Sequence, residues 1–459
     1  MKLLCIGYDL DPARAGRGGV AIYQDSLARA LAAEGCEVTL FLGTRHTLRA
    51  RPRLRWGWRS GLRMVELLDS PLHHCDPRAD PSLHVHEPRV ESLTREVLRA
   101  VRPDVVHLHD PRLHPAAIID VALAEGCAVL KTVHNHFDLC PQGERFAEQR
   151  EPCGDDRGGA RCRRCLASLP PLSRRRAAWA GTLAATPAAD WLRRGRAALR
   201  RALPRAPVPS SSLRNAPEPL AWPASLYLAR RRALVSRLSR LHAVHVFSRH
   251  LEETLRGVGL SPAKLHRIPP ATLPLEGLRQ ALPRRRLSAP PTFGYLTGGA
   301  ASKGVHVLLE AFARLPRGTA RLRVHGVDDP ARWGRAHPDV DFFGPYDPWR
   351  DLPRVLAPLD VGVVPSLCAE AFGLAGLEFG AAGLPVIGSA IGGIPDWLED
   401  GVNGLLVPPG DPGALADAML RFVREPGLWA RLHEGTRPPK PLATHAREML
   451  ELYRDLRSA

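Results

Sequence analysis

VGVVPSLCAEAFGLAGLEFGAAGLPVIGSAIGGIPDWLEDGVN, residues 361–403, is the stretch of this chain that decides its fold class. Two apolar runs typical of strands, Val361–Val364 and Leu384–Gly388, enclose a glycine-interrupted apolar segment of helical length, Phe372–Ala382. The stretch therefore predicts a strand, a loop, a helix and a second strand. Its first two acidic residues are Glu370 and Glu378.

These two carboxylates suit a particular kind of ligand. Seven residues separate Glu370 from Glu378. Because a helix rises about 1.5 Å per residue, we expect the carboxylates about 12 Å apart, or farther if Glu370 lies in the loop ahead of the helix. That separation fits two sugar rings joined through a diphosphate. The backbone N–H groups at the helix start, near Phe372, Gly373 and Leu374, lie at the positive end of the helix dipole and favour an anion.

The N-terminal segment opens a parallel α/β domain. Its pattern predicts a strand (Leu3–Gly7), a glycine-containing loop, a helix (Val20–Ala33) and a strand (Val38–Leu42). The run Gly16–Ala21 fits the G-x-G-x-x-A pattern of dinucleotide-binding proteins. However, its first glycine lies nine residues beyond Gly7, and the second strand ends without an acidic residue for a ribose. A dinucleotide site is therefore not expected here.

The segment from Arg51 to Pro88 loses apolar periodicity, and we expect an insertion or a long loop there. Regularity returns with a helix at Glu91–Val101 and a strand within Asp104–Asp110. His107 and His109 share one face of that strand, since side chains alternate. We expect the two histidines to pack or to line the rim of a cleft. A metal site is the alternative, although no further ligand follows at a recognisable offset.

The motifs around the two carboxylates resemble those of a known enzyme family. PS-x3-E-x-FG-x4-E, followed by GLPVI, GGIPD and DGVNGLLVPPGD, is similar to the donor-site signature of retaining glycosyltransferases of family 4. The resemblance implies an α/β fold of the GT-B type, with two Rossmann-like domains whose parallel sheets face a central cleft. It places an acceptor-side domain at 1–270, a linker at 271–290, a nucleotide-sugar donor domain at 291–435 and a C-terminal helix, 440–459, that returns to the first domain.

The resemblance also assigns roles on the donor side. Glu378 would hold the ribose hydroxyls and Glu370 the transferred sugar, while Lys303, just ahead of a predicted helix, would contact the diphosphate. Gly18 and Gly19 match the glycine loop that approaches the donor phosphates and the acceptor. An exposed loop lysine and a plain turn are the alternatives for these positions.

A catalytic histidine is expected on the acceptor side. His134 follows the predicted strand Ala128–Val133, where the family carries a cleft histidine. Asn135 replaces the aspartate that usually follows, and His136 is a second candidate. A neutral imidazole there can hydrogen-bond a sugar hydroxyl or stabilise the departing charge, with an ordinary loop histidine as the alternative.

One cation of the family's pattern is missing. Relatives frequently carry an arginine where this chain has Gly298, five residues ahead of the lysine. Arg249 or Arg17 would have to supply that positive charge at the diphosphate. The sequence does not show which of them does so.

Four cysteines gather soon after the histidine: Cys140, Cys153, Cys162 and Cys165 fall within 26 residues. In a cytosolic protein such clustering favours Zn²⁺ over disulfides. The C-x2-C spacing of the last pair is typical of zinc sites, whereas the wider gaps are not. Some of the glycosyltransferases that the chain resembles carry a comparable insert. We predict a structural zinc at 140–165 that shapes the acceptor side, with reduced, unmetallated cysteines as the alternative.

The chain is strongly basic, with a formal charge of +17. This favours an acidic partner, although arginine-rich sequences with abundant alanine, proline and glycine also arise from GC-rich coding sequence. The basic segment 170–240, with tryptophans nearby, is expected to form short helices that suit docking on anionic lipids, with a solvated helical face as the alternative. No apolar run reaches the roughly 18 residues that span a bilayer. We expect a cytoplasmic protein, peripheral at the inner face of the cell membrane.

These observations lead us to expect transfer of a sugar, with retention, from a UDP- or GDP-sugar to a hydroxyl of a glycan or lipid-linked acceptor, in cell-envelope or polysaccharide synthesis. The resemblance implies that catalysis requires no metal or other cofactor, because Lys303 and helix N–H groups offset the diphosphate charge. Gly298 and Asn135 suggest an alternative, a catalytically silent nucleotide-sugar-binding or scaffold protein. A sugar epimerase of the same fold is a further alternative. A nucleic-acid partner is not expected, since no nucleic-acid-binding motif accompanies the cysteines and arginines.

Overall fold

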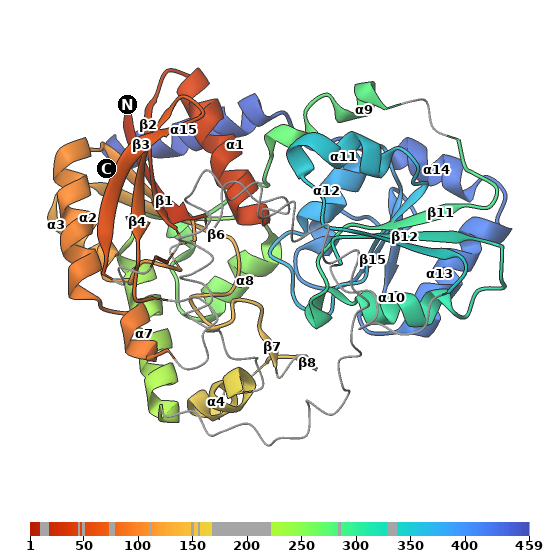
Figure 1. The fold of residues 1–459 in the computed structure, drawn as a ribbon, viewed down its shortest axis with the longest axis horizontal. Helices are drawn as coiled ribbons and strands as arrows, with labels where there is room; N and C mark the ends of the chain where they lie inside the picture. Colours follow the sequence, from red (N-terminus) through yellow and green to blue (C-terminus); the bar gives the residue numbers. More distant parts are fainter. Residues whose placement is uncertain are drawn as a thin grey trace.

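Two α/β domains lie side by side in the computed structural model (Figure 1). Each domain has its own parallel-dominated sheet covered by helices, so the predicted fold class is confirmed. No helix in the described part of the chain is long and apolar enough to cross a membrane. The structure describes residues 1–9, 18–44, 46–47, 51–72, 79–110, 112–147, 151–154, 157–167, 222–282, 286–327 and 337–458.

Within the described residues, eight strands form the sheet of the first domain, in the order β10-β9-β6-β5-β1-β2-β4-β3. Only β3 and β4 pair antiparallel. Alternate residues of β1 serve two cores, Leu3 and Cys5 in one and Leu4 and Ile6 in the other, so helices cover both faces. The strands are β1 (Lys2–Tyr8), β2 (Glu37–Gly43), β3 (Arg53–Arg59), β4 (Leu62–Leu68), β5 (Val105–Leu108), β6 (Ala128–Val133), β9 (Ala243–Val246) and β10 (Leu265–Arg267).

The helices of the first domain divide between these two cores. One face is covered by α1 (Gly19–Ala33) and by the C-terminal helix α15 (Leu442–Ser458). The other face packs against α2 (Pro88–Val101), α3 (Ile118–Ala124), α7 (Ala224–Arg240) and α8 (Arg249–Gly257). The opening strand–helix–strand of the chain is therefore as the sequence predicts.

The second domain has a parallel sheet with the order β13-β12-β11-β14-β15-β16 in the described residues. The stretch 361–403 forms β14, α12 and β15 in the predicted order, but α12 begins at Leu374 because Gly373 adopts a left-handed conformation with φ 90°. Glu370 therefore lies in the loop ahead of the helix. The elements are β11 (Thr292–Tyr295), α10 (Val305–Phe312), β12 (Arg321–His325), β13 (Val340–Gly344), α11 (Pro348–Leu356), β14 (Val361–Val364), α12 (Leu374–Ala381), β15 (Val386–Ser389), β16 (Gly404–Val407), α13 (Pro412–Arg424) and α14 (Leu428–Gly435).

The segment predicted as an insertion or long loop contains a β-hairpin, so that prediction is wrong for residues 53–68. β3 and β4 join through Ser60 and Gly61, whose φ angles of 50° and 81° suit a two-residue hairpin turn. On the edge strand β3, Trp58 is 74% exposed. Arg55, on the opposite side of that strand, pairs with the buried Glu66. Leu54, Trp56 and Trp58 alternate with arginines along β3, so the sequence did carry a strand signal, which the expectation of a loop overlooked.

A directional chain of hydrogen bonds fastens α15 to the first sheet. The carbonyl of Ile268 can only accept, so His245 donates from Nε2 (2.8 Å) and its Nδ1 accepts from the Thr132 hydroxyl (2.8 Å). Thr132 in turn accepts from His107 Nε2 (2.6 Å), and His107 Nδ1 accepts from the hydroxyl of Tyr453 on α15 (2.7 Å). This polarity requires neutral imidazoles, and burial lowers the pKa of His245 to about 4 and that of His107 well below its usual range. The last helix thus packs against the first domain, on α1 and β5.

A small appendage follows β6 and rests on α7. It comprises the hairpin of β7 (Phe146–Ala147) and β8 (Glu151–Pro152) and the helix α4 (Ala160–Ala167). Three helices are expected in the basic segment, at 174–185, 190–203 and 224–240, and the first two lie outside the described residues. The third is confirmed as α7.

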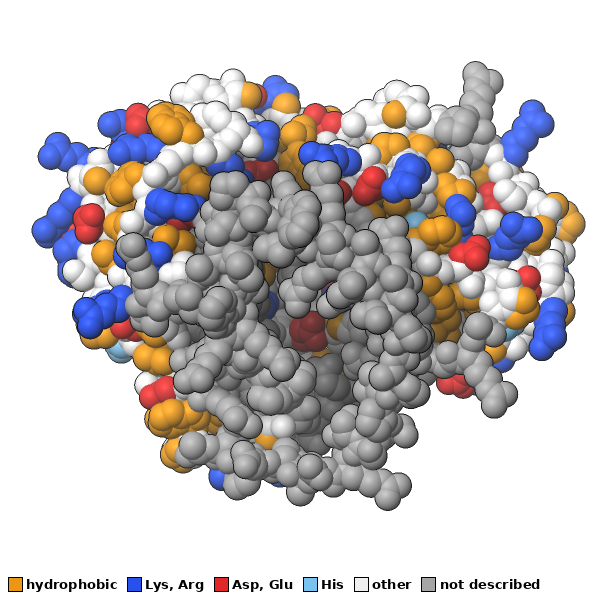
Figure 2. Space-filling view, viewed as in Figure 1, with side chains coloured by type: hydrophobic (Ala, Val, Ile, Leu, Met, Phe, Trp, Pro, Cys, Tyr) orange, Lys and Arg blue, Asp and Glu red, His pale blue; other side chains and the backbone are white. Residues whose placement is uncertain are grey.

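Three of the five arginines of α7 contact other parts of the first domain. Arg237 and Arg240 both pair with Asp120, and the buried Arg230 donates to His84 Nδ1 and to the carbonyl of Phe137. On the face seen in Figure 2, the Lys and Arg side chains are scattered over both domains. Neither observation points to a lipid-docking patch among these residues.

Candidate active site

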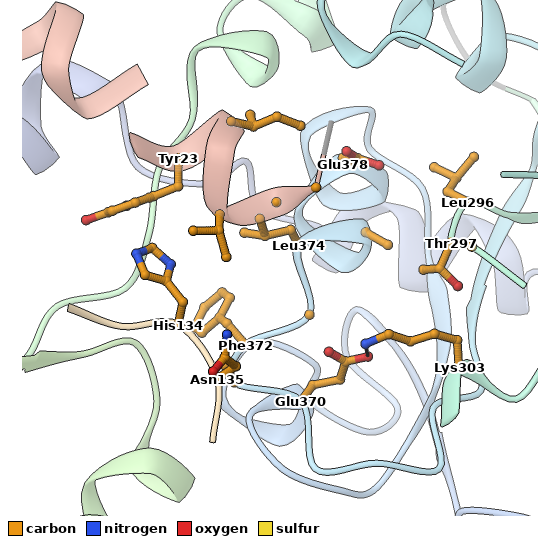
Figure 3. Close-up of a pocket in the computed structure, with 18 of the residues that line it drawn as sticks. Tyr23, His134, Asn135, Leu296, Thr297, Lys303, Glu370, Phe372, Leu374 and Glu378 are labelled. Carbon is orange, nitrogen blue, oxygen red and sulfur yellow. Dashed lines mark hydrogen bonds and ion pairs between the residues drawn. The ribbon is translucent and has the colours of Figure 1, made fainter. Parts of the chain in front are cut away.

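A cleft of about 750 Å³ lies between the two domains. From the first domain, its wall contains the start of α1, Tyr23 on that helix, and the residues directly after β6. The second domain contributes the loop ahead of α10, the loop between β14 and α12, and α12 itself. Figure 3 shows how these side chains converge. The sequence-predicted residues that line the cleft are Gly18, Gly19, His134, Lys303, Glu370, Phe372, Gly373, Leu374 and Glu378.

Glu370 and Lys303 form an ion pair at the floor of the cleft (Figure 3). Lys303 Nζ lies 2.8 Å from Glu370 Oε1, which also accepts a hydrogen bond from Ser366 Oγ at 2.7 Å. Burial would raise the pKa of Glu370, but the charge of Lys303 and these hydrogen bonds hold it below its usual range. Burial would lower the pKa of Lys303, and the carboxylate outweighs burial and raises it. Both groups are therefore charged at neutral pH, and an incoming anion competes with Glu370 for the lysine.

Glu378 lies farther along α12 in a different environment. The hydroxyl of Tyr346 donates to Glu378 Oε2 at 3.0 Å. Burial raises the pKa of Glu378 to about 7, against the hydrogen bond from Tyr346, which lowers it. Tyr346 precedes α11 and was not predicted from the sequence, because its proximity to the carboxylate depends on how α11 packs beside α12. The two carboxylates of the motif are thus electrostatically unlike: one is held ionised, the other titrates near neutrality.

The glycine loop of the first domain approaches the start of α12. An added Cβ at Gly19 would lie 2.5 Å from Leu374 Cδ1, so a larger residue there displaces the leucine. Gly18 caps α1 with its carbonyl, which accepts from the N–H of Ala21 at 3.0 Å. Because the first N–H groups of a helix have no intrahelical acceptor, the start of α12 presents donors and a positive dipole end to the cleft.

His134 lies on the acceptor-side wall (Figure 3). Its ring packs edge-on against Tyr23 and Phe247, and its Nε2 is 3.3 Å from His109 Nδ1. Burial, followed by repulsion from neighbouring histidines and cations, lowers the pKa of His134 well below its usual range, so the ring is neutral. Asn135, the residue that replaces the expected aspartate, donates to Asp110 Oδ2 at 2.6 Å.

The three other histidines of this region have different partners. His136 donates from Nε2 to the carbonyl of Ala369 in the second domain at 3.2 Å. The rings of His107 and His109 lie 4.0 Å apart within the protein, so the two residues share one strand face and pack, as expected.

The positive charges of the cleft differ from those expected. An added Cβ at Gly298 would meet only a carbonyl oxygen at 3.9 Å, so the position of the missing arginine is open space. Arg249 is exposed and does not line the cleft, and Arg17 lies outside the described residues. Arg112, which the sequence did not single out, lines the acceptor side and donates from Nε to Asp110 Oδ2 at 2.9 Å. Among the described residues that line the cleft, one arginine, Arg112, and one lysine, Lys303, supply positive charge.

The four cysteines of the insert lie in the appendage. Cys162 and Cys165 are on α4, and Cys165 Sγ accepts from Gln142 Nε2 at 2.8 Å. Across the residues that the structure describes, no group of three or more His, Cys, Asp or Glu side chains is arranged to hold a metal ion. The described residues thus do not bring these cysteines together as a ligand set, and zinc at Cys140, Cys153, Cys162 and Cys165 stays a prediction.

The comparisons with known proteins agree with this architecture. Among solved structures, the chain is similar to sucrose-phosphate synthase from Thermosynechococcus elongatus, with a TM-score of 0.62, 22% identity and coverage of 99% of this chain and 98% of the other. It is also similar to the Anabaena protein HepE in complex with UDP and glucose, with a TM-score of 0.58, 14% identity and 99% coverage of both chains. These likenesses define the fold as GT-B.

Family models cover both domains. The model described as Glycosyltransferase Family 4 matches residues 17–178, and the model described as Glycosyl transferases group 1 matches residues 290–425. The chain thus belongs to the glycosyltransferases that these two models describe, with family 4 matched in the first domain and group 1 in the second.

Curated relatives align over only part of their length. A D-inositol 3-phosphate glycosyltransferase of Frankia alni is 35% identical over 144 residues, which cover 28% of this chain and 35% of the relative. Another from Streptomyces bingchenggensis is 33% identical over 208 residues, which cover 40% of this chain and 45% of the relative. The matched segments thus span less than half of these relatives.

Proposed function

We propose that the protein transfers a sugar from a nucleotide-diphosphate-sugar to an acceptor hydroxyl with retention of the anomeric configuration. The observation that carries this proposal is a pair of unlike carboxylates around the start of α12, one in the loop ahead of the helix and one on the helix. The N–H groups between them favour an anion. Glu370 is held ionised beside Lys303, and Glu378 titrates near neutrality beside Tyr346. Family membership supports the same reaction class.

Each donor-side group has a role in this proposal. The diphosphate takes the place of Glu370 as the partner of Lys303 and lies against the N–H groups at the start of α12. Glu370, released from the lysine, accepts hydrogen bonds from hydroxyls of the transferred sugar. Glu378 accepts from the ribose hydroxyls. Positive charge and N–H donors then meet the negative charge that grows on the leaving diphosphate, and we propose that the reaction needs no metal ion for this purpose.

The acceptor hydroxyl lies against the opposite wall. His134 is neutral, so it offers one N–H and one lone pair, and it can order the hydroxyl without adding charge. In this scheme the acceptor oxygen bonds to the anomeric carbon on the face that the diphosphate leaves, and the leaving phosphate oxygen takes the proton of the hydroxyl. The configuration is thereby retained without a covalent intermediate. Glu370 is therefore not assigned as a nucleophile.

The acceptor is a sugar-like or polyol hydroxyl in this proposal. The names of the curated relatives suggest D-inositol 3-phosphate as one acceptor to test, beside glycan and lipid-linked acceptors. Arg112 on the acceptor wall supplies a cation that suits a phosphorylated acceptor.

A thermal-shift screen of UDP- and GDP-sugars, followed by a transfer assay with these acceptors, tests the proposal. A donor that binds only the native state raises its melting temperature by mass action. We expect one nucleotide-sugar to stabilise the protein and to be turned over. Binding of a nucleotide-sugar without hydrolysis or transfer across the acceptor panel would instead favour the silent scaffold, for which the open space at Gly298 is the structural argument.

A further inference from the structure

One side-chain hydrogen bond crosses the cleft directly ahead of a donor-side carboxylate. His136 Nε2 lies 3.2 Å from the carbonyl oxygen of Ala369, and Ala369 precedes Glu370 in the chain. A carbonyl can only accept, so the proton is on Nε2 of the imidazole. His136 is 3% exposed, and burial, with the neighbouring cations, lowers its pKa to about 3, so the ring is neutral.

His136 is held in place by its own loop. Its backbone N–H donates to the carbonyl of Gly143 at 2.8 Å, and its carbonyl accepts from the N–H groups of Leu139 and Cys140 at 2.9 and 2.7 Å. The ring also packs edge-on against His250, with centroids 5.4 Å apart. The imidazole is therefore a fixed donor that points from the first domain to the second.

The loop that receives this hydrogen bond is also held by backbone hydrogen bonds within its own domain. The N–H of Leu367 donates to the carbonyl of Ser302 at 2.8 Å, and the carbonyl of Glu370 accepts from the N–H of Gly393 at 2.8 Å. These bonds fix the loop within the second domain. The hydrogen bond from His136 to Ala369 fixes the same loop relative to the acceptor wall.

A second contact between the domains lies beside the first. The carboxylate of Asp396, in the GGIPD motif, accepts from the backbone N–H of Arg249 at 2.6 Å. Arg249 is the first residue of α8, so a residue of the second domain caps a helix of the first and meets the positive end of its dipole. Together the two bonds hold the loop carrying Glu370 against the acceptor side.

We propose that His136 is a positioning residue: by donating to Ala369 it sets the distance and orientation of Glu370 relative to the acceptor wall. This inference rests on the proposed transferase function, since Glu370 acts on the transferred sugar. His136 does not touch the reacting atoms. It aligns the donor side of the cleft with the acceptor wall. A misplacement of about 1 Å between reacting groups lowers a rate by up to about a hundredfold.

The first test compares variants at one position. His136→Phe keeps a ring of similar size and removes the N–H, whereas His136→Gln keeps a side-chain N–H. We expect His136→Phe to lower kcat about ten- to a hundredfold while the dissociation constant for the nucleotide changes less than about twofold, because Lys303 and Glu378 are untouched. His136→Gln should recover kcat to within about threefold of the wild type. An unchanged kcat in His136→Phe, or an equal loss in both variants, overturns the proposal.

The matched control is His250→Phe, which replaces the neighbouring imidazole and leaves the hydrogen bond to Ala369 in place. It should keep the kcat of the wild type. A loss in His250→Phe as large as that in His136→Phe would mean that ring packing alone explains the effect, and would overturn the assigned role.

A measurement without substrate separates this inference from the proposed function. Hydrogen–deuterium exchange of the unliganded protein should be several-fold faster in residues 365–373 of His136→Phe than in the wild type, with no change in β14. Equal exchange in that loop overturns the positioning role, even if transfer activity is found. If no donor is turned over, the proposed function fails, while faster exchange still supports the contact between the domains.

Discussion

In the proposed donor site, the raised pKa of Glu378 predicts that donor binding depends on pH through this one residue. Burial raises the pKa of Glu378 to about 7, although the hydroxyl of Tyr346 donates to it. An ionised carboxylate accepts hydrogen bonds from both ribose hydroxyls, whereas a protonated carboxyl retains one hydrogen of its own. We therefore expect the affinity for the nucleotide-sugar to increase as pH rises through about 7.

The size of this effect follows from the titration. With a pKa of about 7, the ionised fraction of Glu378 rises about tenfold between pH 6 and pH 8. The dissociation constant should fall by about the same factor. In the unliganded protein, the free energy of unfolding changes in the opposite direction. The pKa of Glu378 in the folded protein lies above the ordinary carboxyl value, so stability is lost as the pH rises to about 7. A bound donor offsets that loss.

Calorimetric titration of a nucleotide-sugar at pH 6, 7 and 8 measures how the dissociation constant changes with pH. Glu378→Gln should bind with pH-independent affinity, close to that of the wild type at pH 6 and weaker than it at pH 8. Tyr346→Phe should move the midpoint of the wild-type curve to higher pH, because the hydroxyl that lowers the pKa is gone. A pH slope that persists in Glu378→Gln would refute the assignment.

Three substitutions and one metal analysis have definite expected outcomes. Lys303→Ala removes the charge that holds the pKa of Glu370 low, so kcat should fall about a hundred- to a thousandfold in steady-state assays. Gly19→Ala pushes against Leu374 Cδ1, 2.5 Å from the added Cβ, and should raise the donor KM several-fold, with Leu374→Ala in the same chain restoring it. Tyr453→Phe leaves a buried histidine of β5 without its donor and should cost about 1–3 kcal/mol in urea unfolding, with kcat unchanged. Metal analysis of gently purified protein should find about one zinc per chain if the cysteine insert binds the ion, and a ratio near zero would contradict that prediction.

The donor half was predictable because its signals are local. The strand, the two carboxylates and the helix of the motif lie within 361–403, and the glycine at 373 ends the loop with a φ of 90°. The family resemblance assigned Lys303 to the diphosphate, and its place beside the motif agrees with parallel sheets, which bring their strand ends to one edge. The ion pair between Lys303 and Glu370 was not foreseen, because both had been assigned to ligand groups.

The rest of the site depends on contacts between distant parts of the chain. Tyr346 reaches Glu378 only through the packing of α11, and Arg112 lines the cleft through the loop after β5. His136 meets Ala369 across 233 positions of sequence, and no local pattern encodes such a pair. The hairpin of β3 and β4 did carry local signals, the Ser-Gly turn at 60–61 and the alternating tryptophans and arginines of β3, which the expectation of a loop overlooked.

The anomeric configuration of the product is the most direct test of the central claim, that Glu370, Lys303 and His134 together transfer a sugar from the front face of the donor. Nuclear magnetic resonance of the product formed from a nucleotide-sugar of known configuration reads it out. We predict the configuration of the donor, with the rate lowered by Glu370→Gln and by His134→Ala. An inverted product, or a nucleotide-sugar that binds the cleft and is never turned over, would contradict the account.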